Sequence, residues 1–166
     1  MNRPADFAFK QRPIGIAPMR IEEMSHEACI EFVQRVRFGR LACEQAGQPY
    51  VTPFFFACHH DALYSFSTVG QKVAWMRANP RVCVEADEVT SPQQWTSVIA
   101  FGRFEELPAE TQYDSERKLA YSLLQQRPIW WEPGYARSML GGNERPLDLV
   151  YFRIHIGQIS GHQARP

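Results

Sequence analysis

The most informative stretch of the chain is residues 49–72, which read PYVTPFFFACHHDALYSFSTVGQK. Residues 50–58 are rich in aromatic and β-branched side chains, a polar HHDA segment follows, and residues 63–67 resume the apolar pattern. This arrangement predicts a β-hairpin whose turn is the HHDA segment. A short helix is predicted directly after it, because the next run of residues ends at Asn79 and Pro80.

Polar residues gather where the hairpin meets this helix, namely Ser67, Thr68, Gln71 and Lys72. A helix N-terminus presents free backbone N–H groups and the positive end of the helix dipole, so hydroxyls and an ammonium group there favour a phosphate monoester. A structural alternative stays open, because a Ser or Thr before a helix is often only an N-cap and a lysine is often a solvated charge. The P-loop pattern GxxxxGK(S/T) is absent from the sequence.

Four motifs follow one another along the chain: PYVTPFFF, LYSFSTVGQK, NPRVCVEAD and QWTSVIAFGR. In this order they resemble the FMN-binding split-barrel family, and the resemblance covers residues 19–161. That family includes pyridoxamine 5′-phosphate oxidase and, closer in length and wording, the nitroimidazole-resistance and related flavin proteins. The resemblance implies FMN as cofactor, bound in a cleft between the two subunits of a homodimer.

The resemblance also implies a set of cofactor-binding residues. Backbone groups on the strand at 50–56 meet the edge of the isoalloxazine ring, the turn at 67–72 holds the phosphate, and one serine contacts the ring from its polar edge. By number these residues are Pro53, Phe54, Phe55, Ser67, Thr68, Gln71, Lys72 and Ser97.

Two departures from the family pattern limit the expected activity. The chain stops at GHQARP without the longer ending, with its Trp and Arg, that pyridoxamine-phosphate oxidases use to hold cofactor and substrate, and Gly70 and Gln71 stand where those oxidases carry a second basic residue. The shorter ending means that vitamin B6 oxidation is not expected, and the missing basic residue predicts weaker FMN affinity. No GxGxxG motif is present, so a nicotinamide donor would dock directly on the flavin.

We expect an FMN-dependent oxidoreductase that passes electrons from a reduced nicotinamide to a small acceptor, such as a nitroaromatic or a quinone. Because a flavin carries the hydride chemistry itself, no catalytic acid or base is assigned. A flavin-binding protein without turnover, for storage or sensing, is the alternative. A haem-binding split barrel has less support, because no histidine stands in a matching motif.

Large aromatic side chains also occur in the Pro- and Gly-rich loop at residues 127–146, as Trp130, Trp131 and Tyr135. Apolar rings of this size are expected to pack against another surface instead of pointing to water. One interpretation is a lid on the core, and the other is a wall over a planar substrate or a dimer contact.

The rest of the chain predicts one domain at residues 21–166, preceded by an extended arm at 1–20. A helix is predicted after Ser25, from the apolar spacing of Cys29, Phe32, Val33 and Val36, and a second one over 110–126. The fold predicted is mainly β, a six-stranded antiparallel split β-barrel with outer helices. Its strands are expected at 40–44, 50–58, 63–67, 81–88, 95–105 (the longest) and 148–160.

The composition of the chain bears on which binding partners and which cellular compartment are expected. The 166 residues carry 18 basic and 18 acidic side chains, which gives no case for a nucleic acid or a membrane surface. No apolar run is long enough for a membrane helix, and the four scattered cysteines are expected to be reduced core residues, so a cytoplasmic location is expected. No metal site is expected, because the paired histidines at 59–60 lack a third ligand and His155 and His162 are isolated.

Overall fold

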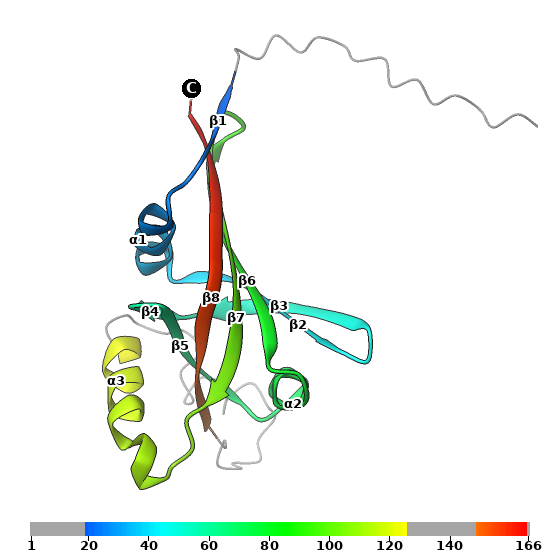
Figure 1. Cartoon of the computed structure of the whole chain (residues 1–166), viewed down its shortest axis with the longest axis vertical. Coiled ribbons are helices and arrows are strands. Elements are labelled where there is room, and N and C mark those ends of the chain that lie inside the picture. The colour runs from blue at the N-terminus through cyan, green and yellow to red at the C-terminus, as the bar shows by residue number, and fades with distance from the viewer. Residues whose placement is uncertain (1–18, 126–148, 166) are drawn as a thin grey trace, which may run out of the picture.

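The computed structural model describes residues 19–125 and 149–165, which form one antiparallel sheet of eight strands with three α-helices packed around it (Figure 1). The strands run in the order β3-β2-β6-β7-β8-β5-β4, and β1 pairs with β8. The elements are β1 (Arg20–Glu23), α1 (His26–Val36), β2 (Phe38–Gln45), β3 (Gln48–Phe55), β4 (Ala57–His59), β5 (Ala62–Thr68), α2 (Gln71–Ala78), β6 (Arg81–Ser91), β7 (Gln94–Glu106), a 3₁₀ turn (Thr111–Tyr113), α3 (Asp114–Gln125) and β8 (Leu149–Arg165).

The predicted hairpin is only partly correct, because its first strand is two strands. The chain bends at Phe56, whose N–H donates to the carbonyl of Arg37 at 3.1 Å. Before the bend β3 pairs with β2, and after it β4 pairs with β5, so β3 and β4 stand at opposite ends of the strand order. The chain links the two ends of the sheet at Phe56, but no pairing joins β3 to β4 among the described residues, so the barrel is split there. This break and β1 account for eight strands where six were predicted.

One buried side chain connects the two ends of the sheet. Ser65 is only 5% exposed and is the sole buried polar residue in the described part of the chain. Its hydroxyl on β5 donates to the carbonyl oxygen of Phe55, the last residue of β3, at 2.7 Å. This hydrogen bond satisfies two buried polar groups and fixes the backbone at the bend.

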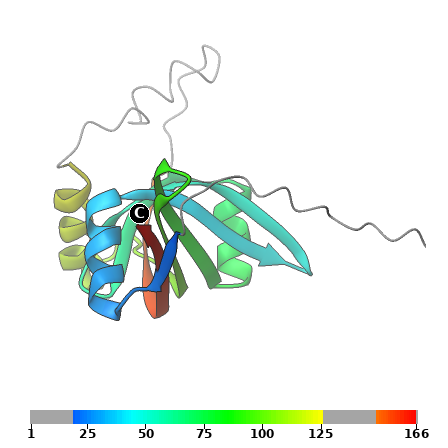
Figure 2. The same cartoon turned by 90° about the horizontal axis from the view of Figure 1, so that it is seen from above.

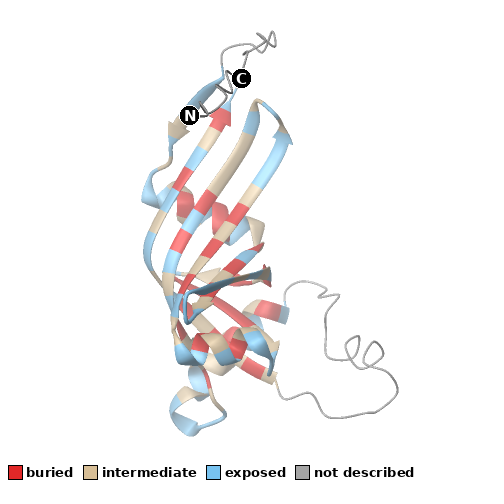
Figure 3. Ribbon diagram, turned by 90° about the vertical axis from the view of Figure 1, so that its right-hand side faces the viewer, coloured by how far each residue is buried: buried red, intermediate tan, exposed pale blue. Residues whose placement is uncertain are grey.

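The long strands β6, β7 and β8 alternate between buried and more exposed residues along much of their length (Figure 3). On β7, Val98 is 1% exposed and Phe101 is 50% exposed, so one face is packed and the other is open. The pairing of β7 with β8 shifts at Gly102, where a Cβ would stand 2.5 Å from the carbonyl oxygen of His155. The expectation that β7 is the longest strand is wrong, because β8 spans 17 residues.

Helices α1 and α3 lie to one side of the long strands in Figure 1 and α2 lies to the other, and α1 and α2 bury side chains in the same core (Figures 1 and 2). The α1 prediction is confirmed: Ser25 accepts the N–H of Ala28 at 3.2 Å, and the apolar stripe faces the main core. Helix α3 starts at Asp114, later than predicted, and its predicted end falls outside the described residues. Tyr121 on α3 is 53% exposed. No helix within the described residues has the length and apolar character to cross a membrane.

Candidate functional site

The N-terminus of α2 is open. Gly70 occupies the N-cap position in an extended conformation and supplies no side-chain cap, and the first turn contains no acidic residue. The first bond of the helix runs from the N–H of Ala74 to the carbonyl of Gly70 at 3.0 Å. The N–H groups of residues 71–73 therefore lack a partner within the helix. The alternative in which Ser67 or Thr68 caps the helix is contradicted, because both residues end strand β5.

Lys72 lies in this first turn and is half-buried. Burial lowers the pKa of its ammonium group below the ordinary 10.5, because the charged form loses solvation, and the nearby Cys43 partly offsets this effect. Within the described residues Lys72 makes no hydrogen bond or ion pair. A partly desolvated cation without a counterion, beside open N–H groups, fits a bound anion.

Strand β3 presents an open backbone edge next to this helix. Among the described strands it pairs only with β2, and its Tyr50 ring contacts the Trp75 ring of α2 with centroids 5.6 Å apart. The turn at Ala46 and Gly47 joins β2 to β3, and Gln45 and Gln48 form the hydrogen-bonded pair next to it. Counting from this pair, every second residue of β3 directs its backbone N–H and C=O groups toward β2. The residues that direct their backbone groups away from β2 are then Pro49, Val51, Pro53 and Phe55. The two prolines leave this edge poor in N–H donors.

The structure does not bring all of the predicted site together within one chain. Ser97 lies on the open outer face of β7, with its hydroxyl 3.4 Å from the carboxylate of Glu85. Strand β7 is three strand spacings from β3, which is about 14 Å. Pro53 is exposed, Phe54 is buried and Phe55 is half-buried, whereas Trp130, Trp131 and Tyr135 lie outside the described residues.

Two further expectations need correction. Cys83 is half-buried on the outer face of β6 and is not a core residue, unlike the buried Cys29 and Cys43. His155 is not isolated, because its Nε2 lies 2.5 Å from a carboxylate oxygen of Glu105. The same carboxylate accepts a hydrogen bond from Arg153 at 2.7 Å, and together these contacts lower the pKa of Glu105.

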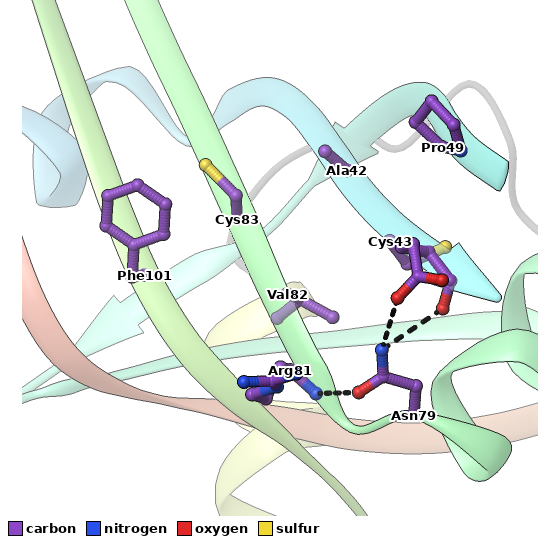
Figure 4. A pocket seen from close by; sticks show the side chains of 9 residues that line it. Ala42, Cys43, Pro49, Asn79, Arg81, Val82, Cys83 and Phe101 are labelled. Atoms are coloured by element: carbon purple, nitrogen blue, oxygen red, sulfur yellow. Dashed lines mark hydrogen bonds between the residues drawn. The ribbon is translucent and has the colours of Figure 1, made fainter. Parts of the chain in front are cut away.

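A pocket of about 290 Å³ opens on the outer face where β2, β3, β6 and β7 meet the end of α2 (Figure 4). Its wall is mostly apolar, and polar groups enter at its lower end. Sequence reasoning did not find it, because its residues come from four separate segments, and no local motif marks them. The lining consists of Ala42, Cys43, Glu44, Pro49, Asn79, Arg81, Val82, Cys83 and Phe101.

Comparison with known proteins assigns the family. The family model described as pyridoxamine 5′-phosphate oxidase matches residues 25–163. An uncharacterized protein of Rhizobium meliloti (strain 1021) is 38% identical over 146 residues, which cover 88% of this chain and 97% of that protein. A crystal structure of a FAD-binding protein from Mesorhizobium loti is 40% identical with a TM-score of 0.74, and the match covers 90% of this chain and all of that one.

A putative 5-nitroimidazole antibiotic resistance protein from Bacteroides thetaiotaomicron has the same fold at 15% identity, with a TM-score of 0.61 and coverage of 90% and 93% of the two chains. The split barrel and the matched family model agree with the order of motifs in the sequence. This chain belongs to the pyridoxamine 5′-phosphate oxidase family.

Proposed function

We propose that this protein binds a flavin nucleotide, with the 5′-phosphate at the N-terminus of α2 and the ring edge against β3. The observation that carries the proposal is the half-buried Lys72, which has no ion-pair partner in the described chain and lies at an uncapped helix start. A phosphate there would accept hydrogen bonds from the N–H groups at 71–73 and from Lys72. Ser67 and Thr68 end strand β5 just before this helix, and Gln71 is the first residue of α2.

The edge of β3 is chemically suited to the polar edge of an isoalloxazine ring, which carries one N–H between two carbonyl groups. The carbonyl of Pro53 points away from β2 and can accept from that N–H. Proline has no N–H of its own at this position, so it does not place a second donor against the ring donor. Ser65 holds the neighbouring Phe55 carbonyl and thereby fixes the backbone that meets the ring.

FMN is the cofactor expected from the sequence, and the Mesorhizobium loti relative makes FAD the second candidate. Both flavins contain riboflavin 5′-phosphate, so the contacts at Lys72 apply equally to either. Identifying the flavin released from the purified protein by chromatography and mass spectrometry decides between them. Release of neither flavin, together with no binding of added FMN or FAD, contradicts the proposal.

We propose that the site is completed across a homodimer. Within one chain Ser97 is too far from β3 to share a ring with it, so a ring lying on β3 would meet Ser97 of a second copy. The outer face also exposes apolar side chains that a partner would cover, including Val51 (62% exposed), Ile99 (38%) and Phe101 (50%). Analytical ultracentrifugation at micromolar concentration should give twice the chain mass, and a strict monomer refutes this part.

The bound flavin would supply the hydride and electron chemistry. The chain's own groups hold the phosphate, orient the ring edge and keep part of the site dry. We propose a reduced nicotinamide as donor and a small nitroaromatic or quinone as acceptor, with storage or sensing of flavin as the alternative. Vitamin B6 oxidation is not proposed.

Anaerobic mixing of the flavin-loaded protein with NADPH or NADH separates these two functions. A reductase loses its visible flavin absorbance within seconds and regains it when a nitroaromatic is added. A flavin that stays oxidised with both donors over an hour contradicts the reductase, unless another donor such as a deazaflavin reduces it.

A further inference from the structure

Ser65 connects two strands that do not pair with each other. Four strands separate β3 from β5 in the order of the sheet, so no ladder of backbone hydrogen bonds joins them among the described residues. The Ser65 hydroxyl on β5 donates to the carbonyl oxygen of Phe55, the last residue of β3, at 2.7 Å. The ten residues between them run through the bend at Phe56, through β4 and through the turn before β5. This hydrogen bond therefore closes a loop across the split of the barrel.

Packing alone does not require a hydroxyl at this position. Ser65 is 5% exposed, and its register partner Phe152 on β8 is fully buried. Leu63, two residues earlier on the same face of β5, is fully buried as well. A buried hydroxyl costs free energy unless it is hydrogen-bonded, and an alanine would fit among these apolar side chains without that cost. The hydroxyl therefore contributes a defined geometry at Phe55.

The two strands lead to the two halves of the proposed flavin site. Strand β5 ends at Thr68, three residues beyond Ser65, and the chain then enters the N-terminus of α2, where Lys72 lies in the first turn. On the other strand, Pro53 lies two residues before Phe55 and directs its carbonyl to the open edge. The hydrogen bond thus lies between the half of the site that would hold the phosphate and the half that would meet the ring.

We propose that Ser65 is a positioning residue, which holds the N-terminus of α2 and the edge of β3 at the separation that one flavin phosphate needs. This inference rests on the flavin site proposed above. A ligand that contacts two groups at a fixed spacing gains affinity, because binding of one part keeps the other part at a high effective concentration. When the spacing loosens, part of that gain is lost, although Lys72 and Pro53 themselves are unchanged.

A double-mutant cycle with Lys72 is the direct test. In the native background, Lys72→Ala should lower FMN affinity about tenfold to a hundredfold. In the Ser65→Ala background, the same change should cost only about threefold, because a bound ring no longer holds the phosphate against Lys72. Equal losses in the two backgrounds would show that the residues act independently, and they would overturn the proposal.

Comparison of FMN with riboflavin separates positioning from general support of the fold. Ser65→Ala should weaken FMN more than riboflavin, because riboflavin contacts only the ring half of the site. Ser25→Ala is the matched control, since it also removes one serine hydroxyl with one hydrogen bond, from the N–H of Ala28 at 3.2 Å. It should leave both the ratio of the two affinities and the effect of Lys72→Ala unchanged. Equal weakening of FMN and riboflavin by Ser65→Ala, or a smaller effect of Lys72→Ala in the Ser25→Ala background, would overturn the spacing role.

Hydrogen exchange in the flavin-free protein tests the connection itself. The N–H of Phe56 donates to the carbonyl of Arg37 at 3.1 Å, directly beside the Ser65 contact. In Ser65→Ala this amide and the amides at the end of β5 should exchange faster, whereas in Ser25→Ala they should exchange as in the native chain. Unchanged exchange in Ser65→Ala would overturn the connection.

Failure of the flavin proposal has a different outcome from failure of the Ser65 role. If the native chain binds neither FMN nor riboflavin while Ser65→Ala still exchanges faster, the flavin site is wrong, and the spacing role is wrong with it. If the native chain binds FMN and the losses in the cycle are additive, only the role of Ser65 is wrong.

Discussion

The N-termini of α1 and α2 differ in a way that separates structure from function. At α1, Ser25 caps the helix, and Glu27 in the first turn has a lowered pKa, chiefly through a hydrogen bond from backbone N–H. At α2, Gly70 offers no side-chain cap, and Lys72 occupies the first turn, where a cation is unfavourable. The first helix supplies its own anion, whereas the second leaves a place for one. A helix N-terminus that has no side-chain cap and carries a lysine in its first turn is therefore a candidate anion-binding site.

Lys72→Ala should show the largest effect, because it removes the charge from the open helix start. Hydrogen bonds to charged groups contribute roughly 1.5–3 kcal/mol, so FMN affinity should fall about tenfold to a hundredfold. Riboflavin, which has no phosphate, should bind as before. Isothermal titration with both flavins measures this difference. An equal loss of affinity for FMN and riboflavin would place the phosphate elsewhere. The N-termini of α1 and α2 would then not differ in anion binding.

Gly70→Asp should make α2 resemble α1. The extended backbone and open space at Gly70 accept a side chain, and an aspartate there would cap the helix and occupy the anion position. FMN should bind about tenfold more weakly, roughly 1.4 kcal/mol, while the flavin-free protein becomes slightly more stable. Gly70→Asn adds a cap without the charge and should lose less affinity. Unchanged FMN binding in the aspartate variant would contradict the site.

Ser25→Ala should affect stability and leave function alone. Loss of the N-cap bond to Ala28 should lower the free energy of unfolding by about 1 kcal/mol. Urea denaturation measures the change, and flavin affinity serves as the control. A loss of flavin affinity beyond what unfolding explains would show that α1 also takes part in binding.

The pH dependence should be the smallest effect. Burial lowers the pKa of Lys72 below 10.5, so its charge disappears as pH rises through that lowered value, and FMN affinity should fall with it. The unfolded chain keeps this proton up to about 10.5, so the stability of the flavin-free protein should rise with pH between the two values. Lys72→Arg stays charged and should show neither trend. A flat profile in the native chain would contradict the assigned role.

Sequence reasoning succeeded where the signal was local. The cap at Ser25, the apolar stripe of the helix after it, and the strands β6 and β7 all depend on neighbouring residues. It failed at the bend near Phe56, because both sides of the bend have the same aromatic, β-rich composition and differ only in pairing partner. The strand β1 has four residues and no distinctive pattern.

The same difference between local and non-local signals applies to the candidate site. The sequence pointed to Lys72, but no local pattern reports its partial burial or that it has no ion pair among the described residues. Sequence reasoning missed the outer-face pocket for a related reason, because its residues come together only through the register of β2, β3, β6 and β7. The contact of Ser97 with the ring stays a prediction, because the strand order separates Ser97 from β3 within one chain and a second copy would have to supply it.

Strand β8 has a consequence for how the protein is made. It pairs with β1, β5 and β7, yet it is the last of the described elements to leave the ribosome. Until it emerges, the inner edges of those three strands have no partner, while the local hairpins of β2 with β3 and β6 with β7 can already form. A nascent chain that stalls before residue 149 would expose three sheet edges at once, and this is the form in which chaperones or self-association should capture it.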